Sequence, residues 1–137
     1  MAGVGFGAPP EVVFDYLVDP ANRPQWQSSL RRVTDVDGDV RVGQTWVDVT
    51  TVGVRPRMET TALERPGLWR EVGTWGLFSA EVTLTIRPDG AGSVVDVAHR
   101  VAARGPLAPV GWLLDRVAPL AVRADLRRAA AALSRRS

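Results

Sequence analysis

The sequence predicts an α+β domain in which a curved antiparallel sheet of six or seven strands wraps a long C-terminal helix, with two short helices near the N-terminus. Residues 30–104 alternate between apolar and polar side chains and carry Pro-Gly and Asp-Gly turn signals, a pattern typical of an antiparallel meander. Residues 107–134 are instead rich in alanine, leucine and arginine, which favour a helix. Such a sheet must bury one face, and this helix is the available cover.

Length and composition exclude several classes of protein. A chain of 137 residues is expected to form one domain, residues 1–137, with its own core. It contains no cysteine and one histidine, so we expect neither a disulfide framework nor a metal site, and no cofactor. Motifs of covalent catalysis and of nucleotide binding, such as GxSxG and the phosphate-binding loop, are absent from the sequence.

The charge pattern does not favour nucleic acid as a partner. All 17 basic residues are arginine, which explains a pI of about 10.3 at a net charge of only +2. The C-terminal arginines are interleaved with Leu126 and Leu133 at helical spacing, so one face of that segment is expected to pack rather than to bind phosphate. The N-terminus lacks the pattern of a signal peptide, and no apolar run is long enough to span a membrane. We therefore expect a cytoplasmic protein, either a monomer or a homodimer.

The N-terminal quarter predicts the two short helices. In "PPEVVFDYLVDP" (residues 9–20) two prolines and Glu11 suit a helix start, and Val13, Phe14 and Leu17 form a one-sided apolar stripe. Asp19 can cap a second helix over "PANRPQW" (20–26), which closes at Trp26. The preceding "VGFGA" is a candidate opening strand, although its glycines disfavour one.

Six strands are expected in the middle of the chain. They correspond to "LRRVTDVD" followed by "GDVRVG" (30–43), then to residues 44–52, 55–64, 68–78, 80–87 and 93–103. The helix that follows has two apolar stripes that are rotated relative to each other, before and after Pro119. A proline at this position removes a backbone hydrogen bond, so we expect a kink there.

These segments resemble the START-like superfamily, in particular its polyketide cyclase/dehydrase-type branch. The resemblance rests on "APPEVVFDYLVDPANRPQWQSSLRRV", the "VGQTW" turn, "METTALERPGLW" and "SVVDVAHRV", and it covers nearly the whole chain. It implies a helix-grip fold with a hydrophobic ligand cavity between the sheet and the C-terminal helix. The family includes aromatase/cyclases and carriers of lipids and hormones.

His99 is the candidate catalytic residue. In "VVDVAHRV" it shares a strand face with Val95, Val97 and Val101, so we expect it to line the cavity. An imidazole titrates near neutral pH and could transfer protons during a cyclisation. The alternative is a histidine that is hydrogen-bonded in the cavity wall and has no chemical role.

Tryptophans and carboxylates supply the other candidates. Trp69, Glu71 and Trp75 share one face of a strand, and Trp46 and Asp48 share one face of another. Val47 and Val49 are equally good core residues on the opposite face of the second strand, so its inward face stays open. Indoles can stack on flat ligands, whereas the carboxylates are more often exposed on the surface. Near the Gly105-Pro106 hinge, Trp112 and Leu107 could lie at the cavity mouth. The predicted ligand-binding set is Trp46, Met58, Trp69, Glu71, Trp75, Val97, His99, Trp112 and Val117.

Three functions are compatible with these observations. The first is binding of a hydrophobic or aromatic small molecule, as a carrier or sensor without turnover. The second is a polyketide cyclase or dehydratase that uses the same cavity. The third is a protein-interaction module that docks a partner through a sheet face or the arginine-rich tail. A polar cluster around His99 would favour the enzyme, and a purely apolar lining would favour the carrier.

Overall fold

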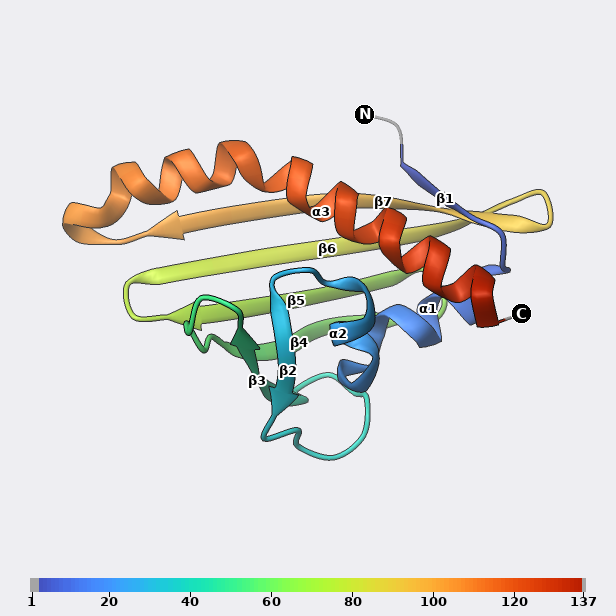
Figure 1. The fold of residues 1–137 in the computed structure, drawn as a ribbon, viewed down its shortest axis with the longest axis horizontal. Helices are drawn as coiled ribbons and strands as arrows, with labels where there is room; N and C mark the ends of the chain where they lie inside the picture. Colours follow the sequence, from blue (N-terminus) through green and yellow to red (C-terminus); the bar gives the residue numbers. More distant parts are fainter. Residues whose placement is uncertain (1–2, 137) are drawn as a thin grey trace.

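The computed structural model describes residues 3–136 and confirms the predicted architecture of a seven-stranded antiparallel sheet and a long C-terminal helix (Figure 1). The elements follow one another in the order β1 (Val4–Phe6), α1 (Pro10–Val18), η1 (Pro20–Asn22), α2 (Arg23–Trp26), β2 (Leu30–Thr34), β3 (Thr45–Thr50), β4 (Arg57–Glu64), β5 (Leu68–Trp75), β6 (Phe78–Asp89), β7 (Gly92–Ala103), η2 (Gly105–Leu107) and α3 (Ala108–Arg136).

The sheet is a meander closed by its first strand. Its spatial order is β1-β7-β6-β5-β4-β3-β2, and every neighbouring pair is antiparallel. The chain therefore starts at one edge and crosses through α1 and α2 to the other edge. It then returns strand by strand until β7 pairs with β1. This path places α1, α2 and α3 together on one side of the sheet (Figure 1).

Two predicted strand segments are shorter than expected. Residues 38–43 form a turn region between β2 and β3, in which Gly38 and Gly43 have φ values of 67° and 90°. Residues 68–78 are divided by a turn at Gly76, whose φ is 56°, and this turn makes β5 and β6 a hairpin. In both places glycine adopts a left-handed conformation that a strand does not allow.

The core lies under α1, the second half of α3 and the middle of the sheet. Val13, Phe14 and Leu17 of α1 are buried, as their spacing predicts, and so are Leu126 and Leu133 of α3. Pro119 lies inside α3, and the helix changes direction around its middle (Figure 1). Only the part after the bend contributes several side chains to the core. None of the helices within residues 3–136 has the length and apolar character needed to cross a membrane.

Candidate functional site

A pocket of about 400 Å³ lies between the inner face of the sheet and the first half of α3. Its walls come from β3 to β7, from the segment after α2 and from Leu114 of α3. Most of the wall is apolar, and the volume is in the range of sites for small organic ligands. At the β5–β6 hairpin, Trp75 and Phe78 stack with ring centroids 5.9 Å apart and form part of the wall. Other apolar lining residues are Met58, Val82, Val101 and Leu114.

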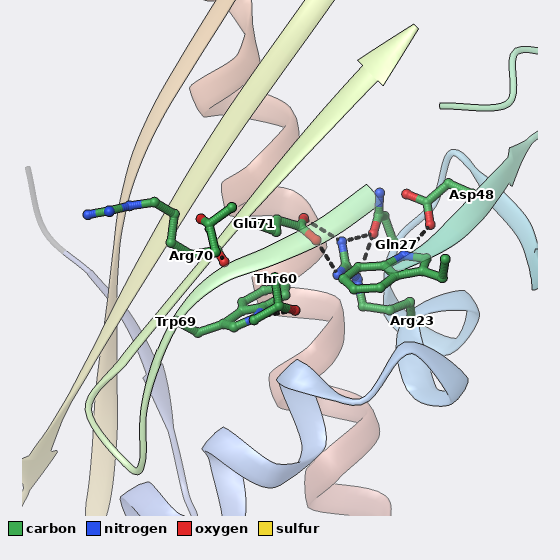
Figure 2. A network of polar contacts seen from close by, with 9 residues as sticks. Arg23, Gln27, Asp48, Thr60, Trp69, Arg70 and Glu71 are labelled. Atoms are coloured by element: carbon green, nitrogen blue, oxygen red, sulfur yellow. Dashed lines mark hydrogen bonds and ion pairs between the residues drawn. The ribbon is translucent and has the colours of Figure 1, made fainter. Parts of the chain in front are cut away.

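Two polar side chains of the pocket wall, Gln27 and Glu71, belong to a buried cluster around Arg23. Its guanidinium donates two hydrogen bonds of 2.8 Å to the two Glu71 oxygens and two more to Gln27 Oε1 (Figure 2). Arg23 and Glu71 are 2% and 4% exposed. Strand alternation explains the placement of Glu71, because it points toward Arg23 whereas the neighbouring Arg70 points to the opposite side (Figure 2). An ion pair this deep is retained only when its hydrogen bonds are satisfied.

Three indole rings surround the same guanidinium. The Arg23 Cζ atom lies 5.1 Å from the ring centroids of Trp26 and Trp69, and 6.0 Å from that of Trp46. Contacts of this kind stabilise a desolvated cation through the negative face of each ring. Burial opposes the charged form of Arg23, but the Glu71 carboxylate more than offsets this effect and keeps the pKa of the guanidinium above its usual value. The cluster therefore lies between the core and the pocket, with its buried guanidinium paired and hydrogen-bonded.

Asp48 is the titratable group with the strongest link to the pocket. It is 3% exposed, lines the pocket, and accepts a 2.9 Å hydrogen bond from Trp46 Nε1. Burial raises the pKa of Asp48 to about 6, against the opposing effects of Arg23 and of the Trp46 hydrogen bond, and the negative charge of Glu71 adds to the rise. A carboxyl group with such a pKa can exchange a proton near neutral pH.

His99 lies on the inner face of β7, as its parity predicts, but it is not among the lining residues of the pocket. Its Nε2 is 3.0 Å from the backbone oxygen of Asp115, and its side chain is 18% exposed. A carbonyl oxygen only accepts, so Nε2 carries the proton in this contact. The Asp115 side chain accepts a 2.7 Å hydrogen bond from Val101 N. His99 thus ties the first half of α3 to the sheet, which is the structural alternative considered above.

The other predicted site residues fall into three groups. Met58, Glu71 and Trp75 line the pocket. Trp46 and Trp69 are each 1% exposed and contact Arg23 instead of the pocket, while Val97 packs against the core. Trp112 and Val117 are 62% and 50% exposed and line none of the hollows described here, so the structure contradicts their placement in the cavity wall. Trp112 instead packs its ring against Arg116.

Sequence reasoning missed the centre of the polar cluster. Arg23 and Gln27 lie one helical turn apart on and after α2, but nothing in "NRPQWQ" distinguishes a buried arginine from an exposed one. The expectation that the carboxylates are exposed is wrong for Asp48 and Glu71, because each is buried with a hydrogen-bond donor. Glu71 accepts from the distant Arg23 guanidinium, and Asp48 accepts from the neighbouring Trp46 indole. Strand parity was the only available signal, and for Asp48 it was ambiguous, because Val47 and Val49 suit the core equally well on the opposite strand face.

A second hollow, of about 650 Å³, lies at the far end of α3 beside α1 and β1. Its charged lining residues, Asp15 and Arg136, are exposed, and none of the side chains of the Arg23 cluster lines it. Within residues 3–136 no group of three or more histidine, aspartate or glutamate side chains could hold a metal ion. The smaller pocket combines an apolar wall with buried ionisable groups, and it is therefore the candidate functional site.

Comparison with protein-family models gives one match, over residues 4–137, to the family described as "Polyketide cyclase / dehydrase and lipid transport". The chain belongs to this family. A comparison with curated protein sequences gave no significant match.

Solved structures of other proteins share the fold of this chain. A START superfamily protein from Mycobacterium smegmatis is 13% identical, with a TM-score of 0.79 over 98% of this chain and 95% of that one. The di-domain ARO/CYC StfQ from the steffimycin biosynthetic pathway is 17% identical, with a TM-score of 0.76 over 97% of this chain and 49% of that one. A conserved protein from Geobacillus kaustophilus is 14% identical, with a TM-score of 0.75 over 98% and 93%. At these identities the likeness is one of fold.

Proposed function

We propose that this polyketide cyclase/dehydrase-family protein binds a hydrophobic or aromatic small molecule in the 400 Å³ pocket and acts as a carrier or sensor. The observation that carries the proposal is the pocket itself, in which apolar side chains of four strands and α3 surround a polar end formed by Gln27, Asp48 and Glu71. Apolar walls supply affinity, and a few fixed polar groups supply orientation.

A pocket-filling variant tests this proposal. Ala80 lines the pocket on β6, whereas Ala98 is exposed on β7. We expect that the protein purified from its own host carries a small molecule in native mass spectrometry, and that Ala80→Trp reduces this occupancy while Ala98→Trp leaves it unchanged. Equal occupancy in both variants would place the ligand elsewhere and contradict the proposal.

Asp48 gives a specific reason to keep the enzyme as a second candidate. A cyclase or dehydratase needs a group that exchanges protons near neutral pH beside its substrate, and the carboxyl of Asp48, with a pKa of about 6 and a place in the pocket wall, meets that need. His99 does not line the pocket and its Nε2 is engaged with Asp115, so the acid–base role passes to Asp48 in this hypothesis.

Asp48→Asn separates the two functions. The amide keeps the shape of the protonated carboxyl and an oxygen that accepts from Trp46. A carrier variant should therefore keep its co-purifying molecule in unchanged chemical form. An enzyme variant should still bind but accumulate an unconverted precursor, which mass spectrometry of the bound molecule would detect as a mass difference.

The absence of nucleic-acid binding and a cytoplasmic location stay predictions of the charge pattern and the N-terminal sequence.

A further inference from the structure

A small inner hollow of about 70 Å³ continues the pocket toward the core. It lies between α2, β5, β6 and the second half of α3. Gln27, Glu71 and Val82 line both spaces, which are therefore adjacent. A group of one or two non-hydrogen atoms at the end of a ligand could therefore reach the inner hollow while the body of the ligand stays in the pocket.

Trp26 lines this hollow and carries an unpartnered donor. The residue is 5% exposed and lines the hollow, and its Nε1 is buried without a hydrogen-bond partner among the described residues. The other two indoles of the cluster differ, because Trp46 Nε1 donates to Asp48 and Trp69 Nε1 donates to Thr60 Oγ1. A buried N–H group without an acceptor is costly, so an oxygen that accepts from Trp26 would be bound favourably.

The charges around the hollow disfavour an anionic acceptor. Glu71 and Asp125 both line it, and Arg23 is the one cation in the lining. The guanidinium already binds both Glu71 oxygens. A ligand carboxylate would meet two acidic side chains against one engaged cation. A neutral hydroxyl group suits the same walls better, because it can accept from Trp26 Nε1 and donate to a carboxylate oxygen.

We propose that the inner hollow is the polar subsite of the pocket and selects ligands that carry a neutral hydroxyl group, a phenol or an alcohol, at one end of an apolar body. The proposal rests on the proposed function and names the chemical class of its ligand. Trp26 is the specificity-determining residue, since its Nε1 is the donor that only an oxygen acceptor can satisfy.

Three probes of one shape test the subsite by isothermal titration calorimetry. These are 2-naphthol, naphthalene and 2-naphthoate, measured on the wild-type protein, Trp26→Phe and the control Trp112→Phe. Trp26→Phe removes the indole N–H and keeps an aromatic ring, and Trp112 is exposed and remote from the pocket lining. We expect 2-naphthol to bind wild type about tenfold more tightly than naphthalene or 2-naphthoate. Trp26→Phe should abolish this preference, and Trp112→Phe should keep it.

The outcomes distinguish the subsite from the pocket. If naphthalene binds as tightly as 2-naphthol, solvent alone satisfies Trp26 and the subsite is refuted, while the pocket remains a binding site. If 2-naphthoate binds most tightly, the hollow is an anion site and the proposal is equally wrong. If none of the probes binds, the proposed function itself is contradicted.

A measurement on the wild-type protein covers the case in which Trp26→Phe does not fold. In a ¹H–¹⁵N spectrum the Trp26 indole N–H signal should shift when 2-naphthol is added and should shift much less with naphthalene. Equal shifts with the two probes would overturn the subsite.

Discussion

The two halves of α3 have similar apolar content but opposite surroundings. After the bend at Pro119, Leu126, Ala129 and Leu133 are buried in the core. Before the bend, Leu113 and Leu114 are 57% and 42% exposed. The first half is attached mainly at two points, where Gly111 packs closely against Ala103 and where Asp115 contacts β7. The sheet therefore packs its core against the second half of α3. The first half contributes Leu114 to the wall of the pocket.

The Arg23 cluster lies at the border between these halves, and breaking it should have the largest effect on stability. Arg23→Met removes the only partner shown for the buried Glu71 carboxylate, and we expect a loss of about 3–5 kcal/mol in the free energy of unfolding. The matched control is Arg65→Met, which breaks the exposed pair with Asp15 and should cost less than about 1 kcal/mol. Urea denaturation measures both, and equal losses would show that the cluster is not buried in solution.

Truncation of one leucine in each half tests the comparison directly. Leu126→Ala should destabilise the protein by about 2–5 kcal/mol, because Leu126 is fully buried and its removal leaves a cavity. Leu113→Ala removes an exposed side chain of the same type and should change stability by less than about 0.5 kcal/mol. Thermal and urea unfolding measure the difference. A large loss in Leu113→Ala would mean that the first half of α3 is covered in solution.

The Asp48 carboxyl in the pocket wall should make the stability of the protein depend on pH. Its folded-state pKa of about 6 exceeds the unperturbed 3.8, so the folded protein binds a proton more tightly than the unfolded chain. Its contribution to stability is full below pH 3.8 and is lost as the pH rises to about 6, a loss of about 3 kcal/mol. Asp48→Asn should therefore match wild type at low pH and exceed its stability at pH 8. Unfolding measured from pH 4 to 8 tests this sign, and a variant that is less stable than wild type at pH 8 contradicts it.

Gly111→Ala should have the smallest effect on the overall stability of the protein, and its effect should be confined to the first half of α3. A Cβ at this position would lie 2.5 Å from Ala103 N, so the helix must move away from β7. We expect faster amide hydrogen exchange in residues 108–118 than in wild type, with little change in residues 121–136. Gly7→Ala is the control, because a Cβ there meets nothing within 4 Å. Uniformly faster exchange along α3 would show that the two halves are one cooperative unit.

The sequence by itself determined the antiparallel meander, the helices and the strand face that carries His99. These features follow from local periodicity and turn chemistry, as the stripe of α1 and the parity of Glu71 and His99 show. Local patterns show the period of a helix or strand but not which element packs against it. The leucines of both halves of α3 therefore predicted one long packed helix, and the pattern did not show that the first half is exposed.

The tertiary structure alone decided which inward-facing side chains meet the pocket. Arg23 and Glu71 are 48 residues apart, and their contact depends on how α2 packs against β5. That contact holds the Trp46 and Trp69 rings beside Arg23, outside the wall of the larger pocket, while the Trp26 indole keeps a donor without a partner among the described residues. A buried charge is tolerated only where the fold places a partner of opposite charge beside it. The spacing of residues in the sequence does not show which residue that partner is.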